Sequence, residues 1–153
     1  HLPLDAHAEL GNNAQLARAL GVKETRPFGR YKGQLIGVAG ALPEPLAPAA
    51  FLDRVAARVG PVHPASRLAG AVRTVGVCSG GAADLLNDAV AERLDVFVTG
   101  EPAEWSHAVA RETGVGFVAA GHHATERFGP MALADRLTAH GLDARFIDVE
   151  NPA

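Results

Sequence analysis

The chain has 153 residues, of which 48% are apolar and 20% charged, and its formal net charge at pH 7 is −3. This length and apolar content predict one globular domain with a real core and argue against wholesale disorder. No stretch approaches the roughly 20 apolar residues of a membrane span, and no basic stripe points to nucleic acid as the main partner. Because Cys78 is the only cysteine, an internal disulfide and a cysteine-based zinc ribbon are excluded, and we expect a cytoplasmic protein.

The first part of the chain alternates between helix and strand signals. Asn12 and Asn13 are typical N-cap residues, and Gly21 is placed to end the helix that they open. Further along, the pattern predicts a strand, a helix that follows a proline-rich loop, and a connection, at residues 34–40, 49–59 and 60–70.

From residue 72 onward, strands and helices alternate regularly. The predicted strands are apolar throughout and cover residues 72–78, 95–99, 115–120 and 144–149. The predicted helices cover residues 82–94, 102–113 and 123–140, with a disturbance in the last one at Gly129-Pro130. Strands of this kind are typical of a sheet that is covered on both faces. We therefore expect an α/β fold, layered α/β/α, with a largely parallel sheet.

Acidic and imidazole side chains follow several of the predicted strands. Ligands of open α/β sheets bind beyond the carboxyl ends of the strands, so these residues define the candidate site. They are Asp5 with the flanking His1 and His7, then Ser79-Gly80-Gly81, then Glu101, and finally His122, His123 and Glu126.

The spacing of His122 and Glu126 points to a metal. Residues four apart lie on one face of a helix, so an imidazole nitrogen and a carboxylate oxygen can reach the same cation. Asp5 would supply a third ligand, and this donor set suits zinc, manganese or iron. The alternative is that His122 caps a helix while Glu126 pairs with Arg127 or with solvent.

The segment Ser79-Gly80-Gly81 lies between a strand and a helix. Paired glycines allow backbone N–H groups to approach a phosphate at the start of a helix. The alternative is a tight turn with Ser79 as the cap, and the segment is neither a dinucleotide fingerprint nor a P-loop. Cys78 is interpreted as a buried strand residue rather than a nucleophile.

Five motifs together resemble one known family, the Nif-three-like dinuclear metal centre hexameric proteins, often called GTP cyclohydrolase 1 type 2 homologs. The motifs are His1-Leu2-Pro3-Leu4-Asp5-Ala6-His7, Gly11-Asn12-Asn13, Cys78-Ser79-Gly80-Gly81, Thr99-Gly100-Glu101 and Gly121-His122-His123-Ala124-Thr125-Glu126-Arg127. The closing Phe146-Ile147-Asp148 with Asn151-Pro152 also matches the way that these proteins end.

The resemblance implies a toroidal hexamer with two metal ions in each subunit. It makes Asp5, His122 and Glu126 metal ligands, with Glu126 as the bridging group. His1, His7, Glu101 and His123 match residues near the centre. The family's remaining ligands are an adjacent His-His pair upstream of the first motif, and that pair is absent here. We therefore expect the chain to be the C-terminal part of a longer protein.

Two functions follow as hypotheses. In the first, the protein is a metal-dependent hydrolase of a nucleotide or another phosphate-containing substrate, and Glu101 or His123 moves protons. The substrate would contact His7 and the Ser79-Gly80-Gly81 turn. In the second, the protein is a non-catalytic metal-binding ring that acts as a scaffold or regulator through protein partners. A dinucleotide-binding domain is disfavoured because the glycine fingerprint is missing.

Overall fold

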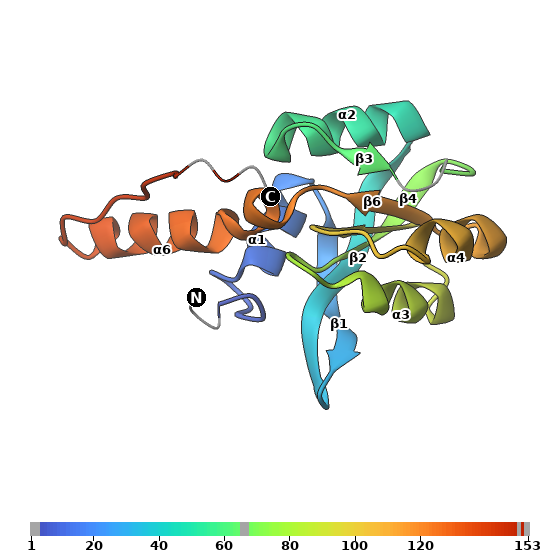
Figure 1. The fold of residues 1–153 in the computed structure, drawn as a ribbon. Helices are drawn as coiled ribbons and strands as arrows, with labels where there is room; N and C mark the ends of the chain where they lie inside the picture. The colour runs from blue at the N-terminus through green and yellow to red at the C-terminus, as the bar shows by residue number, and fades with distance from the viewer. Residues whose placement is uncertain (1–3, 65–67, 150, 152–153) are drawn as a thin grey trace.

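A mixed sheet with helices on both faces forms the body of the protein (Figure 1). The structure, a computed structural model, describes residues 4–64, 68–149 and 151. His1, which the resemblance places near a metal centre, lies outside these residues.

The helices are α1 Asn12–Ala19, α2 Pro48–Val59, α3 Leu86–Ala91, α4 Ser106–Thr113, α5 His122–Glu126 and α6 Phe128–Ala139, and a 3₁₀ turn, η1, covers Ala83–Leu85. The strands are β1 Lys23–Tyr31, β2 Gln34–Leu46, β3 His63–Pro64, β4 Val72–Val77, β5 Val96–Thr99 and β6 Gly116–Ala119. None of the helices in the described part of the chain is long and apolar enough to cross a lipid bilayer.

Within the described residues the sheet has six strands in the order β1-β2-β4-β5-β6-β3. The pairs β4–β5 and β5–β6 are parallel, whereas β1, β2 and β3 pair with their neighbours in the antiparallel sense. The α/β fold expected from the sequence is confirmed. The parallel pairing expected from the sequence holds for β4, β5 and β6, and antiparallel strands flank them.

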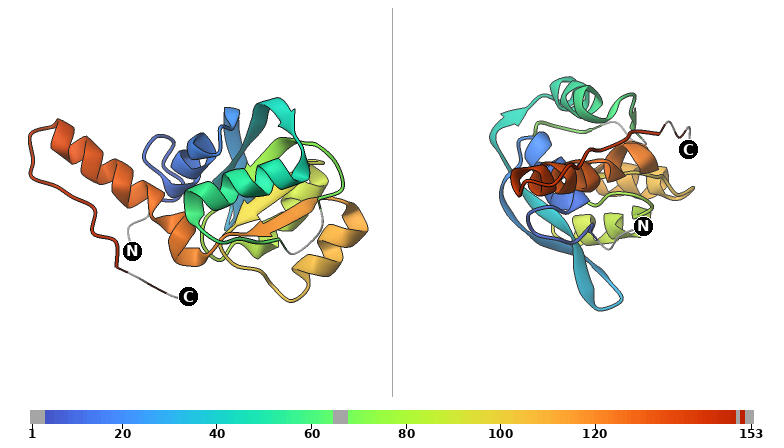
Figure 2. Two further views of the ribbon diagram at one scale, coloured as in Figure 1. Left: turned by 90° about the horizontal axis from the view of Figure 1, so that it is seen from above. Right: turned by 90° about the vertical axis from the view of Figure 1, so that its left-hand side faces the viewer.

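Alternation along the central strands sends side chains into two separate cores. Val96 and Val98 pack on one face with residues of α1 and α2, such as Leu16 and Phe51. Phe97 belongs to the other face, which η1, α3 and α4 cover. Because successive side chains of a strand point to opposite faces, strands that are apolar throughout require this double cover. Figure 2 shows the sheet between its two helical layers.

Strand β1 was not predicted from the sequence. It pairs with β2 to form a long hairpin, and Phe28 and Gly29 are its only buried residues. Since the rest of the strand is exposed, it carries charged residues and Pro27 rather than an apolar pattern. Because β1 lacks an apolar pattern, the sequence predicts a strand only at its partner β2.

The strand expected at residues 144–149 is wrong. Helix α6 projects away from the sheet, and the chain then returns alongside it without regular secondary structure (Figures 1 and 2). Thr138 donates its hydroxyl hydrogen to the carbonyl oxygen of Ala144 at 2.9 Å, which ties the returning segment to the helix. A strand needs a neighbouring strand for its backbone hydrogen bonds, and this segment pairs with none among the described residues.

The first and the last of the predicted helices differ from the structure in ways that affect the candidate site. The helix expected over 123–140 is divided at Arg127 into α5 and α6. Asn12 and Asn13 are not N-caps, because the cap position belongs to Gly11 and both asparagine side chains are buried inside the fold. Their amides bond to distant segments instead, as described below.

Candidate metal centre

Three loops meet at the carboxyl edge of the parallel strands. The backbone carbonyl oxygen of Gly80, after β4, accepts the amide hydrogens of Gly100 at 2.9 Å and of Glu101 at 3.1 Å, after β5. The amide of Gly121, after β6, donates to the carbonyl oxygen of Gly100 at 2.9 Å. These bonds bring together candidate residues that lie far apart in the chain.

Thr125 fixes helix α5 against the turn after β4. Its buried hydroxyl oxygen accepts the amide hydrogen of Gly80 at 3.0 Å and lies 2.9 Å from the carbonyl oxygen of Gly121. Because Thr125 sits between His122 and Glu126, this contact sets the position of both candidate ligands. This role of Thr125 was not predicted, since a threonine within a short helix has no distinctive sequence pattern.

His122 lies between two carboxylates. Its Nδ1 is 2.5 Å from Oε1 of Glu101, and its Nε2 is 3.3 Å from Oε1 of Glu126. An ionised carboxylate can only accept a hydrogen bond, so Nδ1 carries a proton that it donates to Glu101. This arrangement is the one by which proteins orient a metal-binding histidine, with the other nitrogen facing the ion.

The charges at this edge favour a cation. Burial works against a charged imidazole, but the hydrogen bond with Glu101 and the charge of Glu126 outweigh it, so the pKa of His122 lies above its usual value. Burial also raises the pKa of Glu126; His122 opposes part of that rise, and the negative charge of Asp5 adds to it. Several carboxylates thus surround one imidazole, and such a group of negative charges favours a bound cation.

Asp5 lies on the other side of the same edge. Its Oδ1 accepts hydrogen bonds from Nδ2 of Asn12 at 2.8 Å and from the hydroxyl of Ser79 at 3.4 Å. Asp5 and Glu126 line one cavity of about 450 Å³. Nevertheless, no group of three or more His, Cys, Asp or Glu side chains in the described ranges is placed to hold a metal ion.

The donor set therefore fits a divalent ion in part. Nε2 of His122 and Oε1 of Glu126 are separated by a distance that an ion about 2.0–2.2 Å from each donor can span. One imidazole and carboxylates are ligands that zinc, manganese and iron accept. A complete site needs further donors beside this pair.

The Ser79-Gly80-Gly81 turn is used differently from the expected phosphate cradle. The amide of Ser79 donates to Oδ1 of Asn13 at 2.6 Å, and the amide of Gly80 is taken by Thr125. Ser79 itself is 6% exposed, and η1 has no side-chain cap. Two of the amides that would have faced a phosphate are thus occupied within the protein.

The other two histidines of the predicted site have different surroundings. Nε2 of His123 is 2.9 Å from Oδ1 of Asp148, whose other oxygen accepts a hydrogen bond from Arg127 at 2.8 Å. His123 shares a cavity of about 500 Å³ with Glu101 and His122. His7 is exposed, and its Nδ1 accepts the amide hydrogens of residues 9 and 10, so it stabilises a local turn.

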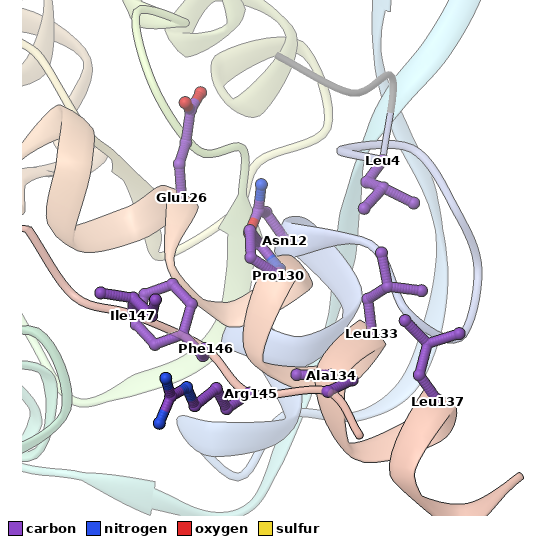
Figure 3. Close-up of a pocket in the computed structure, with 11 residues that line it drawn as sticks. Leu4, Asn12, Glu126, Pro130, Leu133, Ala134, Leu137, Arg145, Phe146 and Ile147 are labelled. Atoms are coloured by element: carbon purple, nitrogen blue, oxygen red, sulfur yellow. The ribbon is translucent and has the colours of Figure 1, made fainter. Parts of the chain in front are cut away.

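A third cavity, of about 420 Å³, extends from Glu126 along α6 (Figure 3). Figure 3 shows its apolar wall, which includes Leu133, Leu137, Phe146 and Ile147. Glu126 borders all three cavities and is therefore the central residue of this edge.

Cys78 is a buried strand-end residue, as interpreted from the sequence. Its side chain is 2% exposed, and burial together with the negative charge of Asp5 raises its pKa to about 12. A thiol of this kind is not a nucleophile at neutral pH.

Comparisons with known proteins show which family the chain belongs to. The family model of Duf34/NIF3 (NGG1p interacting factor 3) matches residues 1–152. A GTP cyclohydrolase 1 type 2 homolog from Pseudomonas aeruginosa is 42% identical over 154 residues, an alignment that covers all of this chain and 61% of the relative. The chain thus spans about three-fifths of the length of such relatives.

Two solved structures are similar along the whole chain. Protein ybgI, described as of unknown function, is 40% identical with a TM-score of 0.90, and 61% of it is covered. TTHA1606 from Thermus thermophilus is 38% identical with a TM-score of 0.80, and 60% of it is covered. Sequence and fold lead to the same conclusion: the chain belongs to the Duf34/NIF3 family.

Proposed function

We propose that this chain supplies one wall of the active site of a metal-dependent hydrolase. The observation that carries the proposal is the position of His122, with Nδ1 donating to Glu101 and Nε2 facing Glu126 at 3.3 Å. In this proposal Asp5, His122 and Glu126 supply part of the ligand set for divalent ions, zinc, manganese or iron, and further donors complete it. Such an ion lowers the pKa of a bound water and polarises the bond to be broken.

The chain's own residues have distinct tasks in this scheme. Glu101 keeps the imidazole of His122 in the tautomer that presents Nε2, and its half-exposed carboxylate can take up or release a proton. Asp148 holds His123 at the cavity of about 500 Å³ that Glu101 and His122 also line, and His123 can transfer a proton there as well. Gly81 lies beside Glu101 and leaves this edge open to a substrate.

The rest of the site is proposed to come from the part of the relatives that this chain does not span. The resemblance assigns two ions to each subunit and places an adjacent His-His pair upstream of residue 1. It also implies a cytoplasmic homo-oligomer, a toroidal hexamer. The exposed apolar side chains of Leu142, Ile147 and Val149 support assembly with further protein surface.

Elemental analysis and turnover of the whole metal-loaded protein test this function. His122→Asn and Glu126→Gln should each lower the bound metal at least tenfold at limiting metal. Glu101→Gln at saturating metal should keep the ion but lose hydrolysis of nucleotides or phosphoesters by about 10–100-fold. An unchanged metal content in both ligand variants would contradict the proposed centre.

The alternative is a non-catalytic metal-binding ring that works through protein partners. The apolar cavity beside α6 and the exposed residues of the returning segment favour it. A metal-loaded protein without turnover on any tested nucleotide or phosphoester, which still binds its partners after Asp5→Ala, would support this alternative.

A further inference from the structure

Residues at the tip of the β1–β2 hairpin line a cavity together with residues of the candidate centre. The cavity of about 450 Å³ joins residues of this tip with residues of the metal edge, namely Arg30, Tyr31 and Lys32 on the hairpin and Asp5, Ser79 and Glu126 opposite. Arg30, Tyr31 and Lys32 have no part in the metal centre proposed above.

The fold holds this tip in place. Tyr31 pairs with Gln34 across a two-residue loop, Lys32-Gly33, in which both residues have positive φ angles of 47° and 86°. Such loops match the twist of a hairpin and define its geometry. The tip is therefore presented by regular strands rather than by a long loop.

The hairpin also packs against the helical layer. A β-carbon on Gly29, whose φ is 69°, would lie 2.6 Å from Cδ1 of Leu85, so the hairpin backbone closely approaches this side chain. The amide of Arg30 donates to Oδ2 of Asp88 at 3.3 Å. These contacts fix the direction in which the tip points.

Arg30 and Lys32 bring positive charge that the protein does not use internally. Nη1 of Arg30 donates to the carbonyl oxygen of Gly33 at 3.0 Å, and Nζ of Lys32 lies 5.1 Å from the centre of the Tyr31 ring. Neither side chain belongs to an ion pair with another described residue. Both are exposed at a cavity whose other charged lining residues, Asp5, Asp84, Asp88 and Glu126, are all acidic.

A substrate of the proposed hydrolase would meet this division of charge. A metal at the acidic wall would attract the reacting end, and the two cations would attract a negatively charged group some distance away. The turn after β4 is poorly suited to that second task, because the amides of Ser79 and Gly80 are already occupied. Arginine and lysine, in contrast, are the usual side chains that bind phosphate.

We propose that Arg30 and Lys32 bind the phosphate group of an organic phosphate substrate in the cavity between the hairpin tip and Glu126. This inference rests on the proposed hydrolytic function and extends it to the recognition of the substrate.

The test uses the whole metal-loaded protein and calorimetric titration with guanosine 5′-monophosphate, guanosine and inorganic phosphate. The hairpin variant is Arg30→Gln with Lys32→Asn, since asparagine tolerates a positive φ. The control variant is Lys23→Gln with Arg26→Gln, which removes the same charge from exposed positions of β1 that do not line the cavity. Metal content is measured on every sample.

The hairpin variant should lose at least tenfold in affinity for the nucleotide, while the control variant and the metal content stay within twofold of the parent. An affinity of the hairpin variant within twofold of the parent would overturn the proposal, as would a parent that binds the nucleotide no better than guanosine. Inorganic phosphate that binds as tightly as the nucleotide would overturn the assignment to an organic phosphate. A parent protein without bound metal would instead refute the proposed function. Metal content and nucleotide affinity are measured separately, so the two proposals can fail independently.

Discussion

Gly80 and Glu126 approach each other so closely that a β-carbon on residue 80 would overlap Oε1 of the carboxylate. The φ angle of Gly80 is 63°, a region that side chains with a β-carbon rarely adopt. Both facts make glycine necessary at this position. The contact joins the turn after β4 to the second of the two candidate ligands on α5.

Replacement of Gly80 by alanine should therefore lower both the free energy of unfolding and the amount of bound metal. The strained backbone and the overlap together should lower the free energy of unfolding by about 2–4 kcal/mol. The measurement is chemical denaturation, with metal content determined beside it.

Gly33→Ala is the matched control for this variant. Gly33 also has a positive φ, 86°, but no atom outside its own stretch of chain lies within 4 Å of the position that an alanine methyl group would take there. It should lose only about 1 kcal/mol from backbone strain and keep its metal. Equal losses in the two variants would show that the contact with Glu126 contributes nothing.

Asn13 connects α1 to the site through both ends of its amide. Nδ2 donates to the carbonyl oxygen of Ile36 at 2.7 Å, and Oδ1 accepts the amide hydrogen of Ser79. Asn13→Ala leaves both backbone groups without a partner in the interior, so we expect a loss of about 2–4 kcal/mol in the free energy of unfolding. Asn87→Ala, at an exposed position, should stay within about 0.5 kcal/mol of the parent.

The thiol of Cys78 should resist thiol reagents in the folded protein. With a pKa of about 12 instead of 9.0, its thiolate fraction at pH 8 is lower by about a thousandfold. Ellman's reagent should label no thiol in the native state and one in denaturant. Labelling of the native protein at the rate of a free thiol would contradict the buried environment.

Asp148 should make the free energy of unfolding depend on pH in the acid range. Hydrogen bonds from Arg127 and His123 lower its pKa below 3.8, so the folded state favours the ionised carboxylate. Its stabilising effect is present above pH 3.8 and disappears as the pH falls through the lowered pKa. Asp148→Asn should therefore be less stable than the parent at about pH 6 but not in strong acid.

The exposed Asp143, changed to asparagine, serves as the control for Asp148→Asn. Denaturation measured across the acid range should show no pH-dependent difference between Asp143→Asn and the parent. A constant deficit of Asp148→Asn at every pH would mean that the ion pairs with Arg127 and His123 do not cause the effect.

Local patterns were sufficient to predict the central part of this fold. The strands expected over residues 72–78, 95–99 and 115–120 are present as β4, β5 and β6, each shorter by one or two residues. Their apolar runs are suited to the middle of a sheet that is covered on both faces. The same alternation placed Glu101, His122 and Glu126 at one edge, since the carboxyl ends of parallel strands coincide.

Contacts between distant residues decided the rest. Asn12 and Asn13 are residues of the type that caps helices. In the structure, however, the side chain of Asn12 bonds to Asp5 and Gly129, and that of Asn13 bonds to Ile36 and Ser79. No local sequence pattern distinguishes a capping asparagine from one that bonds to distant segments, because the side-chain amide forms hydrogen bonds with whichever groups the folded chain brings near. Likewise, the sequence predicts that the amides of the turn after β4 are available to a phosphate, whereas in the structure the amides of Ser79 and Gly80 bond to Asn13 and Thr125.

The sequence by itself determined the α/β class, the family and the residues at the edge of the sheet, because periodicity and short motifs act over neighbouring positions. Only the tertiary structure decided that His122 stands between two carboxylates and that Arg30 and Lys32 of the hairpin tip line a cavity with Glu126. Those relationships depend on how separate strands and loops pack, and that packing is set by burial and hydrogen bonding across the whole chain.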